Sequence, residues 1–246
     1  LNCDEMKNLL AFIFFLFLAL EASSQQGAEF NTLLSREHKG PLLVGHRGGF
    51  DAKLPENSIS NFDFTFKNAC QAPVAIEFDI RESASGSLYI MHDTTVDRTT
   101  NGKGKVTGLT DVYIETLFLR DRNGILTHEK IPLFADVLHF FKDKNIVLML
   151  DVKGKIYGKV ISLVKQMDME AKCILLTFSN QNTQLASSLT NKIMISALVG
   201  NKQEWESIRE IRVPTTQLIA YVNENTPEEI ILDINRNKVL LMTDMS

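Results

Sequence analysis

The sequence has 246 residues, of which 44% are hydrophobic and 23% charged, and its formal net charge is −4. This composition is that of a folded globular protein, and it excludes a disordered tail, a collagen-like repeat and a small disulfide scaffold. The length suits a single α/β barrel. No basic stripe is present in the sequence, which argues against duplex nucleic acid as a partner.

The N-terminal residues form a segment of their own. Residues 9–20 are an unbroken apolar run that follows a lysine and precedes Ala22 and Ser24. Such a run is too short to span a bilayer, which needs about 20 residues. We therefore expect residues 1–24 to be a secretory signal with some upstream sequence, cleaved near Gln25, and the protein to be exported to a periplasm or the extracellular side. The alternative is an uncleaved membrane anchor, whereas the mature chain is expected to have no stable anchor.

Two cysteines remain outside that segment, Cys70 and Cys173. In an exported chain they are candidates for a disulfide bond. They lie in unrelated apolar contexts, however, so we predict two free, buried thiols.

Seven near-continuous apolar runs of strand length alternate with amphipathic stretches of helix length. Runs of this kind are typical of strands buried on both faces, which are usually parallel. The predicted strands are residues 41–45, 74–80, 146–152, 173–178, 193–199, 217–222 and 238–242, with a short additional strand at 87–91. Alternating strands and helices with short connections predict a parallel α/β fold in one domain, residues 25–246.

Five helices or helix starts are predicted between these strands. The stretch 58–69 begins with a serine cap, and Thr226 before Pro227 predicts an N-cap with acidic residues behind it. The other predicted helices are residues 133–142, 158–167 and 183–189. Residues 94–130 are rich in Thr, Gly, Asn and Asp, and we expect them to form an insertion or capping lobe of the kind that often covers a site.

Polar clusters stand at the carboxyl ends of four predicted strands. In chain order they are His46 with Arg47, Glu77 with Asp79, His92 with Asp93, and Asp151 with Lys153. The carboxyl ends of parallel barrel strands share one face, so we expect the four clusters to meet there. Residues two apart in a strand point to the same side, so the carboxylates of Glu77 and Asp79 are expected to converge.

The residue types in these clusters suit the cleavage of a phosphate ester. Three carboxylates in one barrel mouth repel one another unless a cation lies between them, and hard oxygen ligands favour Ca²⁺ or Mg²⁺ over Zn²⁺. The two histidines suit proton transfer near neutral pH. Arg47 and Lys153 suit an anion, for which phosphate fits best.

Five short motifs then follow one another along the chain. They are His46-Arg47-Gly48, Pro55-Glu56-Asn57-Ser58, Glu77-Phe78-Asp79, His92-Asp93, and Arg98-Thr99-Thr100-Asn101-Gly102-Lys103-Gly104. Their sequences and order resemble those of the glycerophosphodiester phosphodiesterase family, most closely over residues 41–155. The resemblance implies a TIM barrel with a small insertion after the second strand. It also implies hydrolysis of glycerophosphodiesters to an alcohol and sn-glycerol 3-phosphate.

The resemblance further implies a role for individual residues. The implied residues are His46 and His92 for acid/base catalysis; Glu77, Asp79 and Asp151 for one divalent cation; Arg47, Lys153 and Tyr221 for phosphate or substrate; and Glu56 and Asn57 in support. Calcium is more available outside the cell, which favours Ca²⁺ over Mg²⁺ for an exported protein.

The number of strands departs from that of a TIM barrel. Seven barrel strands are predicted instead of eight, and no helix follows residues 238–242. We therefore expect the chain to end before the last helix–strand–helix.

Two alternatives to the phosphodiesterase stay open. One is a catalytically inactive barrel that binds phosphate or carbohydrate. The other is a related lipid phosphodiesterase that resembles phospholipase D toxins or phosphatidylinositol-specific phospholipase C. Both histidines and all three carboxylates are present, which favours an active enzyme.

Overall fold

The computed structural model of this protein describes residue 34 and residues 41–69 and 73–243. The predicted signal segment and Cys70 lie outside these residues. Cys173 is a free, buried thiol, as predicted, and its burial raises its pKa. Within the described part of the chain, no helix is both long and apolar enough to cross a membrane.

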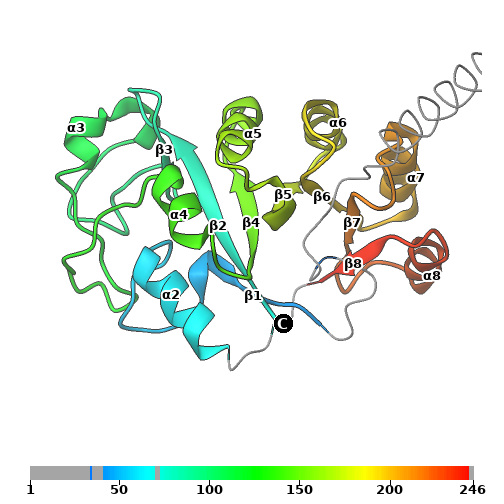
Figure 1. The fold of residues 1–246 in the computed structure, drawn as a ribbon, viewed down its shortest axis with the longest axis horizontal. Helices are drawn as coiled ribbons and strands as arrows, with labels where there is room; N and C mark the ends of the chain where they lie inside the picture. Colours follow the sequence, from blue (N-terminus) through cyan, green and yellow to red (C-terminus); the bar gives the residue numbers. More distant parts are fainter. Residues whose placement is uncertain (1–33, 35–40, 70–72, 244–246) are drawn as a thin grey trace, which may run out of the picture.

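Seven parallel strands form one curled sheet, and the helices lie along its outer side as in part of a barrel (Figure 1). The strands are β1 (Leu43–Gly45), β2 (Val74–Glu82), β4 (Val147–Val152), β5 (Cys173–Thr177), β6 (Met194–Leu198), β7 (Leu218–Tyr221) and β8 (Leu240–Met242). They follow one another across the sheet in chain order, with β1 and β8 as the end strands. This order confirms the predicted parallel α/β fold.

Helices connect consecutive parallel strands, as the alternating pattern predicted. They are α2 (Ile59–Asn68), α3 (Asp111–Ile114), α4 (Phe134–Phe141), α5 (Tyr157–Gln166), α6 (Asn180–Leu189), α7 (Lys202–Ile211) and α8 (Glu228–Arg236). The predicted cap of α2 is present, because the Ser58 side chain accepts a hydrogen bond from the amide of Asn61.

Two helix predictions need correction. Helix α7 was not predicted, although its buried Trp205 and Ile208 lie three residues apart on one face. Thr226 does not cap α8: the N-cap is Pro227, and the Thr226 hydroxyl instead donates to the carbonyl of Val199 at 2.9 Å. The same hydroxyl oxygen accepts from the backbone amide of Asn223 at 3.1 Å, so its recorded donor lies in the loop before α8 and not in the first helical turn.

The two faces of the sheet bury different side chains. On β2, Ile76, Phe78 and Ile80 belong to the large core between the sheet and its helices, whereas Ala75 belongs to a smaller core on the inner face. Alternation along a strand therefore directs the odd-numbered positions of β2 inwards. Val147 and Met149 of β4 share that inner core, so Asp151 continues the same inward row.

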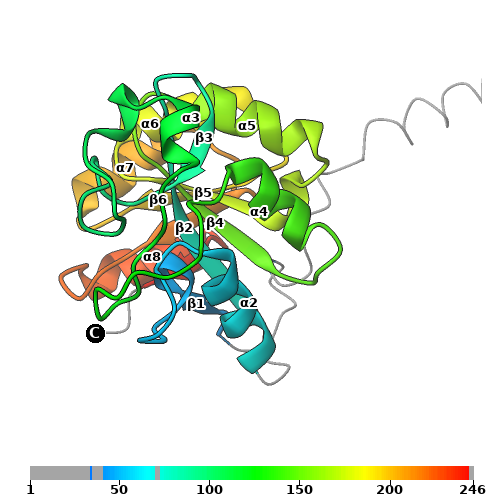
Figure 2. The same ribbon diagram turned by 90° about the vertical axis from the view of Figure 1, so that its left-hand side faces the viewer.

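Residues 94–130 lie between β3 (Leu88–Ile90) and α4, beside the end of β2 (Figures 1 and 2). They have a small core of their own, in which Val96, Val106 and Ile114 pack with Tyr89. Short antiparallel bridges connect Thr100 with Leu119 and other pairs within the segment. This segment is thus a compact lobe with its own apolar core.

The direction of β3, the additional strand, differs from the predicted one. β3 pairs antiparallel with β2, so its carboxyl end does not share the direction of the parallel strands. The hairpin instead turns the chain back along β2, and the amide of Met91 donates to the carbonyl of Asp79 at 2.9 Å. His92, the next residue, therefore comes to lie beside the carboxylates through the hairpin.

Candidate active site

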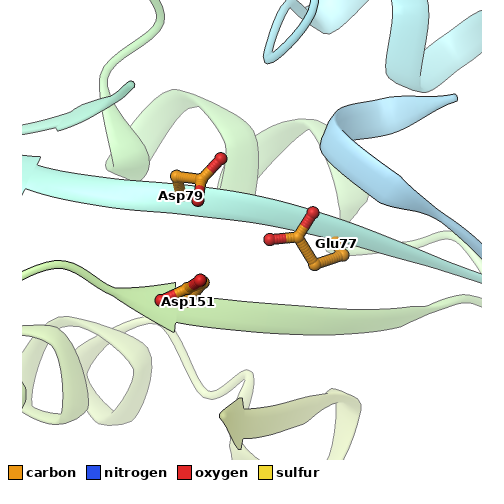
Figure 3. A group of neighbouring side chains, drawn as sticks. All are labelled: Glu77, Asp79 and Asp151. Carbon is orange, nitrogen blue, oxygen red and sulfur yellow. The ribbon is translucent and has the colours of Figure 1, made fainter. Parts of the chain in front are cut away.

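Three carboxylates from two neighbouring strands converge on the inner face of the sheet (Figure 3). Asp79 of β2 pairs in register with Asp151 of β4, and Glu77 lies two residues before Asp79. One oxygen of each carboxylate lies within 4.8 Å of the others. Glu77 and Asp79 are buried, with exposed fractions of 6% and 1%. The strand alternation used in the sequence analysis therefore brings these predicted residues together.

Burial and mutual repulsion raise the free energy of the ionised form of this cluster. Burial, together with the charges of Asp79 and Asp151, raises the pKa of Glu77 to about 8. Burial also raises the pKa of Asp151, and this effect outweighs the opposing ion pair with Lys153. A bound cation would offset the repulsion and favour the ionised carboxylates.

Lys153 lies against these carboxylates. Its Nζ is 3.0 Å from an oxygen of Asp79 and 2.5 Å from one of Asp151. Burial lowers the pKa of the ammonium group, but its bonds to the two carboxylates prevail and the pKa is raised. Lys153 thus stays charged and supplies one positive charge to the acidic cluster.

The His46–Arg47–Gly48 turn directly follows β1 and closes over the cluster. The amide of Arg47 donates to Glu77 at 2.7 Å, and the Nε2 atom of His46 lies 4.0 Å from the same carboxylate. Arg47 has a left-handed φ of 51°, which non-glycine residues seldom adopt. The His46 side chain is 59% exposed, so it remains accessible to a ligand.

Helix α2 packs against this turn and donates side-chain hydrogen bonds to it. Asn61 donates to the carbonyl of Arg47 at 3.3 Å, and Thr65 donates to the carbonyl of Gly48 at 2.5 Å. Phe62 packs so closely that a Cβ on Gly48 would lie 2.5 Å from its ring. Gly48 also has a φ of +93°, a conformation that other residues rarely adopt.

We expect Gly48→Ala to destabilise the protein by roughly 1–3 kcal/mol, because it adds both backbone strain and a clash with Phe62. Chemical denaturation at pH 7 measures this change. Gly108→Ala is the matched control, because a Cβ at Gly108 meets no atom within 4 Å. Equal stability losses in the two variants would contradict this account of the turn.

The supporting residues Glu56 and Asn57 have separate partners. The side-chain amide of Asn57 donates to Asp79 at 2.8 Å, and the Asn57 backbone amide donates to the carbonyl of Arg47 at 2.9 Å. Asn57 therefore orients a predicted metal ligand and also holds the His46–Arg47 turn. Glu56 is buried and accepts from Arg47 Nη1 at 3.2 Å.

Arg98, from the lobe of residues 94–130, connects several of these groups. It donates to both oxygens of Glu56 at 2.6 and 3.0 Å, and to both oxygens of Asp93 at 2.9 and 2.7 Å. The hydrogen bonds and charge of Arg98 lower the pKa of Asp93 well below its usual range. Asp93 in turn lies 2.8 Å from Nδ1 of His92 and fixes the orientation of the ring.

Two arginines of this network, Arg98 and Arg81, were not predicted as site residues. Arg98 stands in the Arg-Thr-Thr motif, which carried the resemblance without a function for the arginine. Arg81 lies two residues beyond Asp79 on β2, and it donates twice to the carbonyl of His92 at 2.9 and 2.6 Å. The two-residue spacing from Asp79 could have identified Arg81, because side chains two apart on β2 point to the same face of the sheet.

Tyr221 lies at the end of β7, apart from the carboxylate cluster. Its ring packs edge-on against Phe178 with the centroids 6.5 Å apart. Phe178 is 48% exposed and directly follows β5. The two aromatic rings therefore mark an apolar patch near the carboxyl ends of β5 and β7.

The carboxylate cluster fits a hard divalent cation. All three donors are oxygens, two of the side chains are buried, and their mutual repulsion is relieved by positive charge. Among the residues that the structure describes, Glu77, Asp79 and Asp151 are the group that could hold such an ion.

Cation binding is expected to release about one proton at pH 7, because Glu77, with its pKa of about 8, must lose its proton to become a ligand. The apparent affinity should therefore rise with pH and level off above about 8. Calorimetric titration of the metal-free protein with Ca²⁺ in two buffers of different ionisation enthalpy measures the proton release. Binding without proton release, and with equal affinity at pH 6 and 8.5, would contradict the pKa shift of Glu77.

The sheet is a parallel α/β sheet of barrel type. Acidic, histidine and basic side chains gather at one end of it around a candidate metal site, which defines the class of protein. Residues 46–241 match the model of the glycerophosphoryl diester phosphodiesterase family. The chain belongs to this family.

Relatives and solved structures agree with this assignment. The chain is 30% identical over 166 residues to a glycerophosphodiester phosphodiesterase of Caldanaerobacter subterraneus, a match that covers 64% of this chain and 66% of that protein. It is 36% identical over 131 residues to glycerophosphodiester phosphodiesterase 1 of Bos taurus, covering 52% of this chain and 38% of that protein. A crystal structure of a glycerophosphoryl diester phosphodiesterase from Parabacteroides distasonis is similar, with a TM-score of 0.75 and 28% identity, covering 82% of this chain and 71% of the other. The chain thus spans less than two thirds of the length of these two sequence relatives.

Proposed function

We propose that this protein hydrolyses glycerophosphodiesters to an alcohol and sn-glycerol 3-phosphate, with the aid of a divalent cation. The observation that carries the proposal is the meeting of the Glu77–Asp79–Asp151 cluster with both His46 and His92 at one end of the sheet. Membership of the family and its named relatives supports the substrate class.

The proposed substrate phosphate binds between the acidic cluster and the basic side chains. Glu77, Asp79 and Asp151 would hold the cation, which when bound would offset the charge of the phosphate and lower the pKa of a coordinated water molecule. Arg47 and Lys153 donate hydrogen bonds to phosphate oxygens. Lys153 must exchange part of its contact with Asp79 and Asp151 for the substrate.

The two histidines move the protons of the reaction. One takes a proton from the attacking water molecule as the new phosphorus–oxygen bond forms, and the other gives a proton to the alkoxide as the bond to the alcohol breaks. His92 is held in place by Asp93, whereas His46 is held by its turn and is more exposed. Both rings therefore approach the substrate from fixed positions beside the cation site.

We favour Ca²⁺ over Mg²⁺, because a cluster of carboxylates on two strands suits a flexible oxygen shell and the apolar run at 9–20 predicts export to a calcium-rich compartment. Tyr221, with Phe178 beside it, is proposed to contact the alcohol moiety. Comparing calorimetric affinities for the two ions tests the choice of metal, and a tighter binding of Mg²⁺ would reverse it.

Identification of the products tests the proposed reaction. The protein is incubated with glycerophosphocholine or glycerophosphoethanolamine and Ca²⁺, and the phosphorus species are followed by ³¹P NMR. We expect glycerol 3-phosphate and the free alcohol. Phosphate that ends on the alcohol fragment would indicate a different phosphodiesterase, and an unchanged substrate with a folded protein would favour a binding barrel.

A further inference from the structure

A cavity of about 210 Å³ lies beside the catalytic network, at the surface of the lobe of residues 94–130. Glu56 and Arg98 form one part of its lining, and Arg120, Asp121 and Arg122 form another. Glu56 also accepts from Arg47, one of the proposed phosphate ligands, at 3.2 Å. Glu56 therefore lines the cavity and also contacts a residue of the proposed phosphate site.

Two of the lining arginines keep their charge available. Arg120 donates to the carbonyls of Thr100 and Gly124, both at 3.0 Å, and Arg122 donates to the carbonyl of Gly49 at 2.5 Å. Peptide carbonyls hold these side chains in position without neutralising them. Within the part of the chain that the structure describes, neither arginine has a carboxylate oxygen within 4.0 Å of its guanidinium group.

The two acidic residues of the cavity already have hydrogen-bond donors. Arg98 binds both oxygens of Glu56 and thereby offsets its charge. One oxygen of Asp121 accepts from the amides of Asn123 and Ile125, at 2.9 and 2.8 Å, within its own loop. Three arginines and two acidic side chains line the cavity, so its lining keeps an excess of one positive charge close to the proposed reaction centre.

The size and charge of the cavity suit a phosphorylated group. A volume of about 210 Å³ is enough for a phosphate and several carbon atoms. Guanidinium groups bind phosphate oxygens through paired hydrogen bonds. Glycerol has no ionisable group, so a second anionic group on a glycerophosphodiester must belong to the other alcohol.

We propose that the cavity lined by Arg120 and Arg122 binds a phosphomonoester on the alcohol moiety of the substrate, so that the enzyme prefers glycerophosphodiesters of phosphorylated alcohols. This inference rests on the proposed function for the location of the scissile phosphate. The arginines act as specificity residues, since they contact a part of the substrate that does not react.

Two substrates that differ by one phosphate test the preference. They are glycerophosphoinositol and the same compound with a phosphate on the inositol ring. We expect kcat/KM to be at least about tenfold higher for the phosphorylated substrate, and this ratio to fall about tenfold in the Arg120→Gln/Arg122→Gln double variant. Lys103→Gln, which removes a charge from the exposed surface of the same lobe, should change the ratio by less than about twofold. Equal kcat/KM values for the two substrates, or a ratio unaffected by the double variant, would overturn the inference.

A binding measurement separates this inference from the proposed function. Inositol monophosphate and inositol are titrated into the protein in the calorimeter, without turnover. Phosphate-dependent binding that weakens about tenfold in Arg120→Gln/Arg122→Gln supports the cavity as an anion site, even if no glycerophosphodiester is hydrolysed. Binding of inositol monophosphate that is equal in wild type and double variant overturns the site, even if hydrolysis is observed.

Discussion

Replacing His92 by alanine is expected to lower kcat for glycerophosphodiester hydrolysis by about 10²–10⁴-fold, and His46→Ala is expected to have an effect of the same size. Each substitution removes one of the two side chains proposed to move protons. KM should change far less than kcat, because neither ring is proposed to carry the binding of the phosphate. Steady-state kinetics with saturating Ca²⁺ measure both parameters.

The control for these variants is His128→Ala, which changes an exposed histidine in the lobe of residues 94–130. It should leave kcat within about twofold of wild type, and the far-UV circular dichroism of all three variants should match that of the parent. A folded His92→Ala protein that retains more than about a tenth of the wild-type kcat would show that another group performs its proton transfer.

Glu77→Gln is expected to stabilise the metal-free protein above pH 7 and to abolish its stabilisation by Ca²⁺. In the wild type, the pKa of Glu77 is about 8 when folded and near its ordinary value of 4.5 when unfolded. The stability that this group contributes is therefore fully present below pH 4.5 and is lost as the pH rises to about 8. Glutamine is neutral at all of these pH values, so the variant avoids that loss. It also keeps an oxygen that can accept from the amide of Arg47.

Thermal unfolding with chelator and with Ca²⁺, at pH 5 and pH 8, measures both parts of this prediction. The metal-free variant should melt several degrees above metal-free wild type at pH 8 and close to it at pH 5. Glu115→Gln, an exposed acid in the lobe, controls for the change in net charge. If metal-free Glu77→Gln is less stable than wild type at pH 8, ionised Glu77 does not destabilise the fold and the prediction is contradicted.

The site could be predicted from the sequence where it depends on strand periodicity. Glu77 and Asp79 lie two apart, and the inner core at Ala75 confirms which side of β2 they face. The position of Asp151 followed from the adjacency of two strands in a parallel sheet, and the register places it opposite Asp79. The positions of these three residues depend on strand alternation and strand order, and not on the conformation of distant loops.

The contacts of Arg98 could not be predicted in this way. Its two carboxylate partners lie 5 and 42 residues away, and only the fold of the lobe brings them together. The antiparallel course of β3 escaped prediction for a similar reason, because a short apolar run does not reveal its direction. The missed helix α7 is different, since the spacing of Trp205 and Ile208 carried a signal that was present in the sequence.

The most direct test of the central claim is the release of glycerol 3-phosphate with Ca²⁺, with a chelator, and with Ca²⁺ restored after chelation. We predict release with the ion, none with the chelator, and full recovery on restoration, and we predict no recovery in Asp79→Asn. Equal release in the presence of the chelator, or undiminished release by Asp79→Asn, would contradict a reaction that depends on a cation held by the Glu77–Asp79–Asp151 cluster.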